Sequence, residues 1–256
     1  MKRIGIIGCG WLGAPLFQKM VAQNLNVFGT VRHSHISDDG IFEWTADEKL
    51  SDDLVKLIRQ ADALVVTIPP QRLLEVDDNI SFHQRLARSL SQENEHAHLI
   101  YTSSTSVYGA SQGDCLERNA DSATRAFGIE KAYLSFFENT TILRFGGLVG
   151  PNRNPSQFFK TGRTIPEPDA WANLTHQDDA IQSILHVLRL SSPGVFNVVC
   201  PELVSRRELY KEAFLRNDLG APTFSEETTK GKKVISDKIR DLLGYTFMKP
   251  NALDCL

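Results

Sequence analysis

The sequence predicts an α/β fold in which a doubly wound parallel sheet carries a small C-terminal lobe. Short apolar runs rich in β-branched residues alternate with segments of helical periodicity through the first 150 residues. A glycine-rich turn follows the first of these runs, and the alternation becomes less regular beyond residue 150. Strands that alternate with helices imply right-handed βαβ units and therefore a parallel sheet.

The strands predicted in the first half are short and apolar, which is typical of parallel strands buried on both faces. They cover Arg3–Ile7, Asn26–Val31, Ile41–Trp44, Ala63–Ile68, His98–Thr102 and Thr141–Phe145. Helical periodicity predicts helices over Trp11–Val21, Ser51–Gln60 and Asp78–Gln92. Ser51 is a favourable N-cap for the second helix, and Pro69 ends the fourth strand.

The second half is less regular and predicts a small lobe. Beyond the loop Gly150–Pro155 we expect an amphipathic helix, one more strand and two further helices. These cover Asp178–Leu190, Gly194–Val199, Arg206–Asn217 and Val234–Leu243. We therefore expect a first domain over residues 1–150, with its sheet completed by residues 194–200. The lobe over residues 151–256 is interleaved with this domain and covers the carboxyl edge of the sheet, where ligands bind in such folds.

The composition is that of an ordinary globular protein and excludes several classes of function. The 256 residues are 41% hydrophobic and 23% charged, with a net charge of −3, so neither disorder nor nucleic-acid binding is expected. No apolar run reaches the roughly 18 residues of a membrane helix, and the first strand begins too early for a signal peptide. The four cysteines form no CxxC pair and the histidines no HExxH motif. We expect a reduced, cytoplasmic protein without a metal site.

A glycine fingerprint follows the first strand. Gly8-Cys9-Gly10-Trp11-Leu12-Gly13 has the form GxGxxG between a predicted strand and a predicted helix. In this pattern Gly8 permits the tight turn, Gly10 lets a pyrophosphate approach the backbone, and Gly13 allows close packing of the helix. The helix N-terminus then offers N–H groups and a partial positive charge to the phosphates. The fingerprint predicts a Rossmann-type, dinucleotide-binding domain.

The end of the second strand indicates which dinucleotide binds. An acidic residue there would bond the ribose 2′-hydroxyl of NAD, but Thr30-Val31-Arg32-His33-Ser34 contains none. Arg32 can pair with a 2′-phosphate, helped by Thr30 or Ser34, which favours NADP(H) over NAD(H). A solvated surface arginine is the alternative interpretation. Pro69 is expected near the adenosine-side ribose, where it contacts the cofactor or only shapes the strand end.

Four further segments carry a family resemblance. They are SSTSVYG over Ser103–Gly109, LRFGGLVGP over Leu143–Pro151, NLTHQDDA over Asn173–Ala180 and KIRDLLGY over Lys238–Tyr245. With the glycine fingerprint, they resemble atypical extended short-chain dehydrogenases/reductases, the NAD-dependent epimerase/dehydratase family. The resemblance covers nearly the whole chain. It implies an NAD(P) cofactor, a small-molecule substrate and a homodimer formed through the helix that carries Lys131.

The resemblance implies roles for the hydroxyl-rich turn. Ser104 matches the family's serine or threonine that positions the reacting oxygen, although such a turn can also satisfy its own backbone. Thr105 and Ser106 occupy the positions of substrate-specific acid/base groups. Neither is a useful acid or base near neutral pH, so a dehydratase with an Asp–Glu pair is disfavoured. Hydride transfer is expected at a carbon held near Ser104, Gly146 and Gly147.

The family's catalytic YxxxK pair is incomplete in this chain. Phe127 and Lys131 occupy its two positions, which share one helix face, but a phenyl ring cannot exchange a proton. Lys131 keeps the role of binding the nicotinamide ribose.

Three interpretations of the missing hydroxyl follow. In the first, the proton comes from Tyr108, Tyr133, His176 or a water held by Ser104. In the second, the protein binds the cofactor without turning it over. In the third, the alignment of this helix with the YxxxK motif is wrong. Among the candidate proton donors, Tyr133 is expected to be a core aromatic residue.

Several cations are substrate-binding candidates. Arg144, Arg153, Lys160 and Arg163 surround the expected cleft and suit a phosphate or carboxylate, and His176 precedes a helix start. Surface solvation is the alternative for each arginine. Because GxSxG is absent, a serine hydrolase is not favoured.

Two functions from different classes remain open. One is an NADP(H)-preferring reductase or epimerase-like oxidoreductase for a small polar or sugar-like substrate. The other is a non-catalytic NADP(H)-binding sensor or regulatory protein, which Phe127 favours.

Overall fold

The computed structural model describes residues 2–32, 39–45, 48–71, 74–159 and 162–256. The chain divides into two compact units, each made of three segments. The first unit comprises residues 1–103, 122–143 and 187–195, and the second comprises residues 104–121, 144–186 and 196–256. The expected boundary at residue 150 differs from this division, because the chain enters the second unit at residue 104 and later returns twice to the first.

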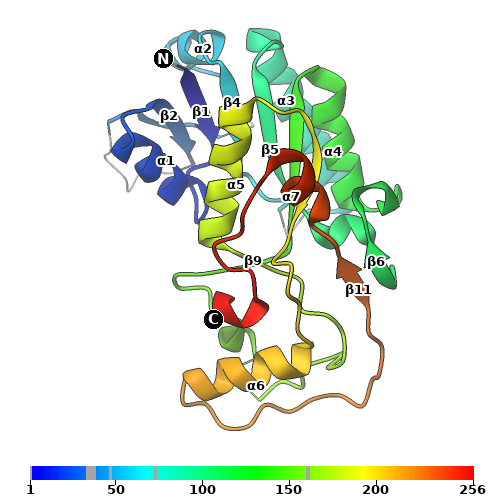
Figure 1. Cartoon of the computed structure of the whole chain (residues 1–256). Helices are drawn as coiled ribbons and strands as arrows, with labels where there is room; N and C mark the ends of the chain where they lie inside the picture. The colour runs from blue at the N-terminus through cyan, green and yellow to red at the C-terminus, as the bar shows by residue number, and fades with distance from the viewer. Residues whose placement is uncertain (1, 33–38, 46–47, 72–73, 160–161) are drawn as a thin grey trace. The chain divides into compact units, whose positions relative to one another are not determined.

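A seven-stranded sheet organises most of the first unit, in the order β10-β7-β5-β4-β1-β2-β3, and its strands β5, β7 and β10 end in residues of the second unit. Its strands are β1 (Arg3–Ile7), β2 (Asn26–Val31), β3 (Ile41–Glu43), β4 (Ala63–Val66), β5 (His98–Ser104), β7 (Thr140–Phe145) and β10 (Gly194–Val198). The neighbouring strands from β3 through β5 pair in parallel. The strand order changes direction between β1 and β4, which is the switch point of a doubly wound sheet. The predicted fold class is therefore confirmed (Figure 1).

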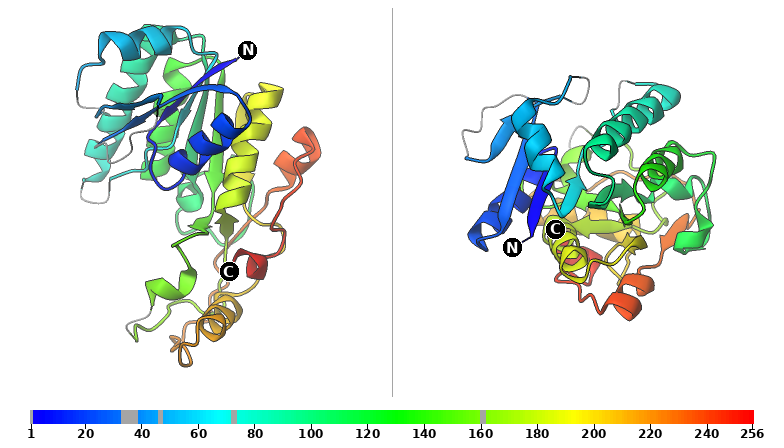
Figure 2. Two further views of the ribbon diagram at one scale, coloured as in Figure 1. Left: turned by 90° about the vertical axis from the view of Figure 1, so that its left-hand side faces the viewer. Right: turned by 90° about the horizontal axis from the view of Figure 1, so that it is seen from above.

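Four helices of the first unit cover the two faces of this sheet. They are α1 (Gly13–Ala22), α2 (Asp52–Arg59), α3 (Val76–Asn94) and α4 (Arg125–Phe136). Side chains of α2, α3 and α4 share one buried cluster with the sheet, whereas α1 lies on the opposite face (Figure 1). The view from above in Figure 2 shows α3 and α4 side by side. The predicted N-cap of α2 is confirmed, because Ser51 Oγ accepts the Leu54 N–H at 3.3 Å.

The second unit is built from short elements. Two parallel two-stranded sheets pair β6 (Gly113–Cys115) with β11 (Lys232–Val234) and β8 (Gly147–Val149) with β9 (Leu174–His176). Its helices are α5 (Gln177–Leu190, which ends in the first unit), α6 (Arg206–Arg216) and α7 (Asp237–Leu243). Four single-turn 3₁₀ helices are Thr105–Tyr108, Glu117–Asn119, Pro155–Phe158 and Ala252–Cys255.

One helix predicted in the second half was wrong at its start. The expected helix from Val234 begins only at Asp237, because Val234 pairs with Cys115 in a sheet. Val234 and Cys115 lie more than a hundred residues apart, and periodicity within a short window cannot reveal such a pairing. α6 packs its Tyr210 and Phe214 against Ile165, which gives the second unit a small apolar core of its own.

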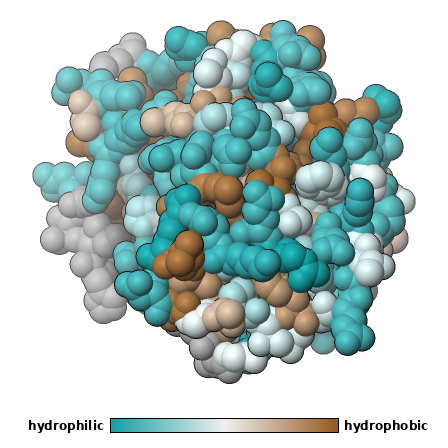
Figure 3. Space-filling model, turned by 60° about the horizontal axis from the view of Figure 1, so that its bottom comes forward, coloured by the Kyte–Doolittle hydropathy of each residue, from teal (hydrophilic) through white to brown (hydrophobic). Residues whose placement is uncertain are grey.

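The surface contains few large apolar side chains. Leu215 and Leu242 are the most exposed of the described ones, at 71% and 69%. On the face drawn in Figure 3, small hydrophobic patches are surrounded by hydrophilic side chains. Within the described ranges, no helix is both long and apolar enough to cross a membrane. All four cysteines are buried and unpaired.

Candidate functional site

The glycine loop of the first unit joins β1 to α1. Gly8 has a φ of +106°, a conformation that favours glycine. Its N–H donates to Thr30 Oγ1 at 3.1 Å, and the Cys9 N–H donates to the Thr30 carbonyl oxygen at 2.6 Å. The end of β2 therefore holds the loop at two consecutive residues.

The three glycines of the fingerprint meet different surroundings. A Cβ on Gly13 would lie 2.2 Å from the Gly8 carbonyl oxygen, so α1 approaches the loop too closely for any side chain. A Cβ on Gly10 would have no described atom within 4 Å, and Gly10 itself is exposed. The backbone at Gly10 is thus open to a ligand, as a pyrophosphate-binding position requires.

The N-terminus of α1 has backbone N–H donors that no side chain caps and no acidic side chain neutralises. Its N-cap, Leu12, makes no side-chain hydrogen bond to the helix, and the first turn contains no acidic residue. The first N–H groups of a helix have no partner within it and carry a partial positive charge. Trp11 is half-buried beside them, and Leu12 is buried. This end of α1 suits an anion.

The residues expected around the cofactor ribose take different positions. Arg32 is exposed directly after β2, and Pro69 is exposed three residues after β4. Thr30 is only 1% exposed and its hydroxyl accepts the Gly8 N–H, so the geometry gives Thr30 a loop-supporting role and does not support direct contact with a 2′-phosphate. His33 and Ser34 lie outside the described residues.

The helix α4 carries the two positions of the incomplete YxxxK pair. Thr124 caps the helix, and its Oγ1 accepts the Phe127 N–H at 3.3 Å. Phe127 is half-buried and Lys131 is exposed, one helical turn apart. Glu130, which the sequence analysis missed, is 2% exposed and accepts a hydrogen bond from Ser103 Oγ at 2.6 Å. This bond joins α4 to the end of β5.

Tyr133 is a core residue, as expected. It is fully buried, and its ring stacks on Tyr101 with 4.5 Å between centroids. Its hydroxyl lies 2.8 Å from His83 Nδ1, on α3. Burial raises the pKa of Tyr133 well above its usual value, and at 0% exposure its hydroxyl is not accessible to a ligand.

The hydroxyl-rich turn of the second unit, Ser104–Gly109, is a serine-bearing turn in which two serines are exposed. Ser104 Oγ accepts the Ser106 N–H at 3.1 Å and caps the 3₁₀ turn Thr105–Tyr108. Ser104 and Ser106 are exposed, whereas Thr105 is 6% exposed. The backbone-capping interpretation of Ser104 therefore holds, and its exposed hydroxyl is still accessible to a ligand.

Tyr108 and Arg144 come together in a buried network of the second unit. Tyr108 is 0% exposed and Arg144 3% exposed. The Tyr108 hydroxyl donates to Asn197 Oδ1 at 2.5 Å and accepts from Arg144 Nη1 at 3.1 Å, and Arg144 also donates to the Glu117 carbonyl oxygen. Burial raises the pKa of Tyr108. The geometry therefore does not support the expected proton transfer by Tyr108 or substrate binding by Arg144, because both side chains are committed to the interior.

Other substrate candidates lie in loops or at strand ends of the second unit. Arg153 is half-buried and Arg163 is exposed, while Lys160 lies outside the described residues. His176 ends β9, and its Nδ1 accepts the Asp178 N–H at 3.2 Å. A Cβ on Gly146 would lie 2.5 Å from the Asn173 carbonyl oxygen, so close packing against β9 already requires this glycine.

Asp179 anchors the C-terminal segment of the second unit. This buried carboxylate accepts hydrogen bonds from the Tyr245 hydroxyl at 2.9 Å and from the Met248 and Lys249 N–H groups at 2.7 and 3.0 Å. Two of the segments that carry the family resemblance therefore hold each other. Their separation of 66 residues left no sequence signal for this contact.

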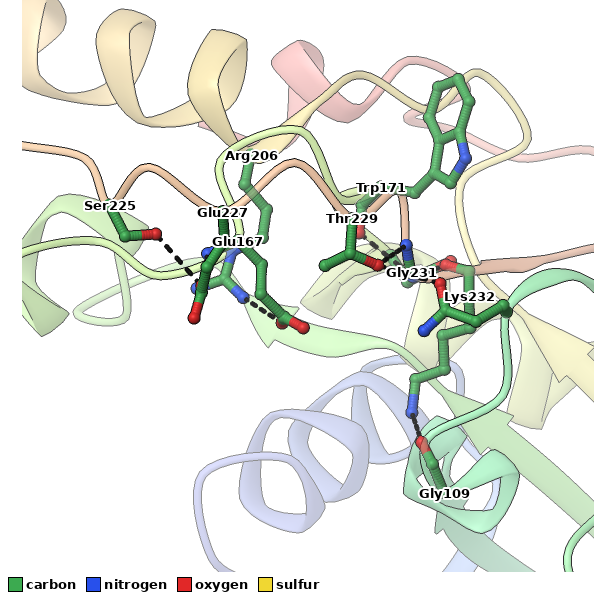
Figure 4. Close-up of polar contacts among 11 residues, drawn as sticks. Gly109, Glu167, Trp171, Arg206, Ser225, Glu227, Thr229, Gly231 and Lys232 are labelled. Atoms are coloured by element: carbon green, nitrogen blue, oxygen red, sulfur yellow. Dashed lines mark hydrogen bonds and ion pairs between the residues drawn. The ribbon is translucent and has the colours of Figure 1, made fainter.

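Lys232 is the second residue that the sequence analysis missed. Its Nζ donates to the carbonyl oxygens of Thr105 at 3.0 Å and Gly109 at 3.2 Å, at the two ends of the serine-bearing turn (Figure 4). Burial lowers its pKa from the usual value. Among the described residues, no cluster of three or more His, Cys, Asp or Glu side chains could hold a metal ion.

Comparisons with known proteins agree with this fold. No family model matches the chain. Protein YeeZ of Escherichia coli (strain K12) is 33% identical over 275 aligned positions, which cover 99% of this chain and 98% of that protein. A solved structure from Methylobacillus flagellatus, described as an NAD-dependent epimerase/dehydratase, superposes with a TM-score of 0.79 at 21% identity over 99% of this chain and 96% of that one.

A second solved structure shares the fold with ligands bound. MoeE5 in complex with UDP-glucuronic acid and NAD superposes with a TM-score of 0.78 at 17% identity, over 99% of this chain and 97% of that one. At this level of identity the likeness concerns the fold. The chain therefore belongs to the family of Protein YeeZ, and its fold is that of the NAD-dependent epimerase/dehydratase proteins, as its sequence motifs indicated.

Proposed function

We propose that the chain is an NADP(H)-preferring oxidoreductase, reductase-like or epimerase-like, that acts on a small polar or sugar-like substrate. The open backbone at Gly10 is the observation that carries the proposal. There the loop, held by Thr30, meets the uncapped N-terminus of α1. Four unpaired thiols also suit a reducing compartment such as the cytoplasm.

The residues present fit a dinucleotide. The backbone around Gly10 and the first turn of α1 would hold the pyrophosphate, and Arg32 would pair with a 2′-phosphate. Lys131, exposed on α4, would bind the nicotinamide ribose, and Phe127 would line the same helix face. A bound nicotinamide supplies or accepts a hydride. MoeE5 contains NAD, which supports a dinucleotide on this fold.

The substrate side of the proposal depends on the second unit. Ser104 and Ser106 offer exposed hydroxyls, which suit the oxygen atoms of a carbonyl or sugar. Arg153 and His176 are half-buried and remain the cationic and imidazole candidates for a polar substituent. MoeE5 contains UDP-glucuronic acid, which supports a sugar-like substrate.

A second function is favoured by Phe127. A phenyl ring in the place of the family's tyrosine removes the usual proton donor, and general acid–base catalysis is worth about 10²–10⁴-fold. A chain that binds NADP(H) without turnover would act as a sensor or regulatory protein. The exposed serines favour the oxidoreductase, because a sensor that only binds the cofactor needs no hydroxyl groups for a substrate.

Turnover with bound NADPH separates the two functions. The purified protein is incubated with NADPH and a panel of small aldehydes, ketones and UDP-sugars, and nicotinamide absorbance and epimer formation are followed. The matched control is Gly10→Ala, in which a methyl group enters the open space above the loop. The oxidoreductase predicts turnover that this variant loses. Tight NADPH binding without turnover of any compound would favour the sensor instead.

A further inference from the structure

Lys232 reaches the serine-bearing turn because of the strand that carries it. β11 pairs in parallel with β6, and Lys232 lies opposite Gly113. Side chains alternate along a strand, so consecutive lysines point to opposite sides. Lys233 Nζ lies 5.5 Å from the centre of the Trp171 ring, whereas the Lys232 side chain extends towards Gly109 (Figure 4).

The contacts of Lys232 leave room for one proton to be gained or lost. A protonated lysine has three N–H donors and no acceptor. The Thr105 and Gly109 carbonyl oxygens take two of these donors, and the described residues provide no third acceptor. A neutral amine still has two N–H groups, so both bonds survive when the third proton leaves. Protonation can therefore change without displacement of the turn.

The charges around Lys232 act in both directions. Burial disfavours the ammonium form and lowers the pKa, while the Cys115 thiol on β6 and the Glu167 carboxylate raise it. Asp114 acts on Cys115 from the same strand. Glu167 also faces Arg206, with 3.6 Å between the Arg206 Nη1 and Glu167 Oε2 atoms, which weakens its pull on Lys232 (Figure 4). Burial outweighs the two raising charges, so the pKa of Lys232 lies below that of an ordinary lysine.

We propose that Lys232 exchanges the proton of a ligand oxygen held on the turn between Ser104 and Gly109. This inference depends on the proposed oxidoreductase function. In the reducing direction, a bound NADPH would supply a hydride to the carbonyl carbon and would leave as NADP⁺. The carbonyl oxygen takes a proton from Lys232 Nζ, and the neutral amine regains one from water. Oxidation reverses both transfers.

The first test measures the amine without any substrate. Wild-type protein is trace-acetylated with acetic anhydride across a pH series, and fragment mass spectrometry separates Lys232 from Lys230 and Lys233. Because only neutral amines react, Lys232 is expected to become reactive at a lower pH than the exposed Lys56 and Lys211. A Lys232 that reacts together with these two lysines, or that does not react at any pH, would overturn the proposal.

The second test uses variants and the same NADPH assay. Lys232→Met is expected to lower kcat by about 10²–10⁴-fold while NADPH affinity stays unchanged. Lys232→Arg keeps N–H donors for the turn but cannot lose its proton near neutral pH. This variant is therefore expected to fold like the wild type and to have the low kcat of Lys232→Met. The matched control, Lys233→Met, keeps the wild-type rate.

The results of the second test separate this inference from the proposed function. A Lys232→Met variant with wild-type kcat and pH profile would refute proton exchange by Lys232. A wild-type protein that binds no NADPH, or turns over no compound, would instead refute the oxidoreductase. In that case the acetylation profile alone decides whether Lys232 is a proton-exchanging amine.

Discussion

Mild acid is expected to destabilise the protein through His83. This residue lies on α3 and is 0% exposed. Its Nδ1 lies 2.8 Å from the Tyr133 hydroxyl, and its Nε2 has no hydrogen-bond partner in the described part of the chain. Burial lowers the pKa of His83 from 6.5 to about 4, because a charged imidazolium would lose its hydration there.

The size and direction of the effect follow from that pKa. The unfolded chain binds a proton at His83 below about pH 6.5, whereas the folded chain binds it only below about pH 4. The folded state therefore loses stability as the pH falls through this window, and it loses nothing from His83 above it. A gap of about 2.5 pH units corresponds to about 3 kcal/mol in total, of which about 2 kcal/mol is lost by pH 5.

The assay compares urea unfolding at pH 7 and pH 5. His83→Gln removes the titrating group, so its unfolding free energy should fall by about 2 kcal/mol less than that of the wild type between the two pH values. The matched control is His96→Gln, whose parent side chain is 85% exposed and which should keep the wild-type dependence. Equal losses in His83→Gln and the wild type would show that His83 is not the source of the acid sensitivity.

A second buried histidine adds to the same window. Burial, and then the charge of Lys2, lower the pKa of His98 to about 4, and its Nε2 lies 2.8 Å from Thr141 Oγ1. The wild type therefore loses more stability in acid than His83 alone explains. The difference between variant and wild type isolates the contribution of His83, because His98 titrates in both.

Three further predictions concern the cofactor loop and α4. Gly13→Ala places a methyl group 2.2 Å from the Gly8 carbonyl oxygen and should lower the melting temperature. Gly10→Ala places its methyl group within 4 Å of no described atom, so it should keep the melting temperature but lose NADPH affinity. Differential scanning fluorimetry measures the melting temperature, and nucleotide titration measures the affinity. Arg32→Ala should weaken NADPH binding by about tenfold or more and change NADH binding little; equal losses would contradict the NADP(H) preference. Phe127→Tyr should raise carbonyl reduction, and no change across the panel of compounds would count against the assignment of α4 to the family's catalytic helix.

Local patterns were sufficient to predict most of the first unit. The alternation of strands and helices, the glycine loop after β1 and the Ser51 cap each depend on neighbouring residues, and the structure contains all three. Tyr133 was assigned to the core because of its aromatic neighbours on one helix, and it is fully buried.

Features that depend on distant residues could not be predicted. Val234 looks helical in its own window but forms a strand with β6, which lies far back in the sequence. Glu130 and Lys232 look like ordinary surface charges until Ser103 and the turn of Thr105 are brought against them.

Burial decided the roles of two other residues. Tyr108 belongs to a segment that resembles a catalytic motif, and Arg144 to one expected beside the substrate. Their side chains face each other in the interior of the second unit. A motif fixes the place of a residue along the chain, whereas its chemistry depends on which groups surround it.

Binding of a dinucleotide by the glycine loop is tested most directly by titration of the purified protein with NADPH and with NADH, followed through nucleotide fluorescence. We predict saturable binding of both nucleotides, with NADPH favoured by about tenfold or more, because Arg32 is exposed directly after β2 and is the proposed partner of the 2′-phosphate. Binding of neither nucleotide would contradict this prediction. The open backbone at Gly10 would then belong to a glycine-rich turn without a ligand, and the chain would have the dinucleotide-binding fold but not bind a dinucleotide.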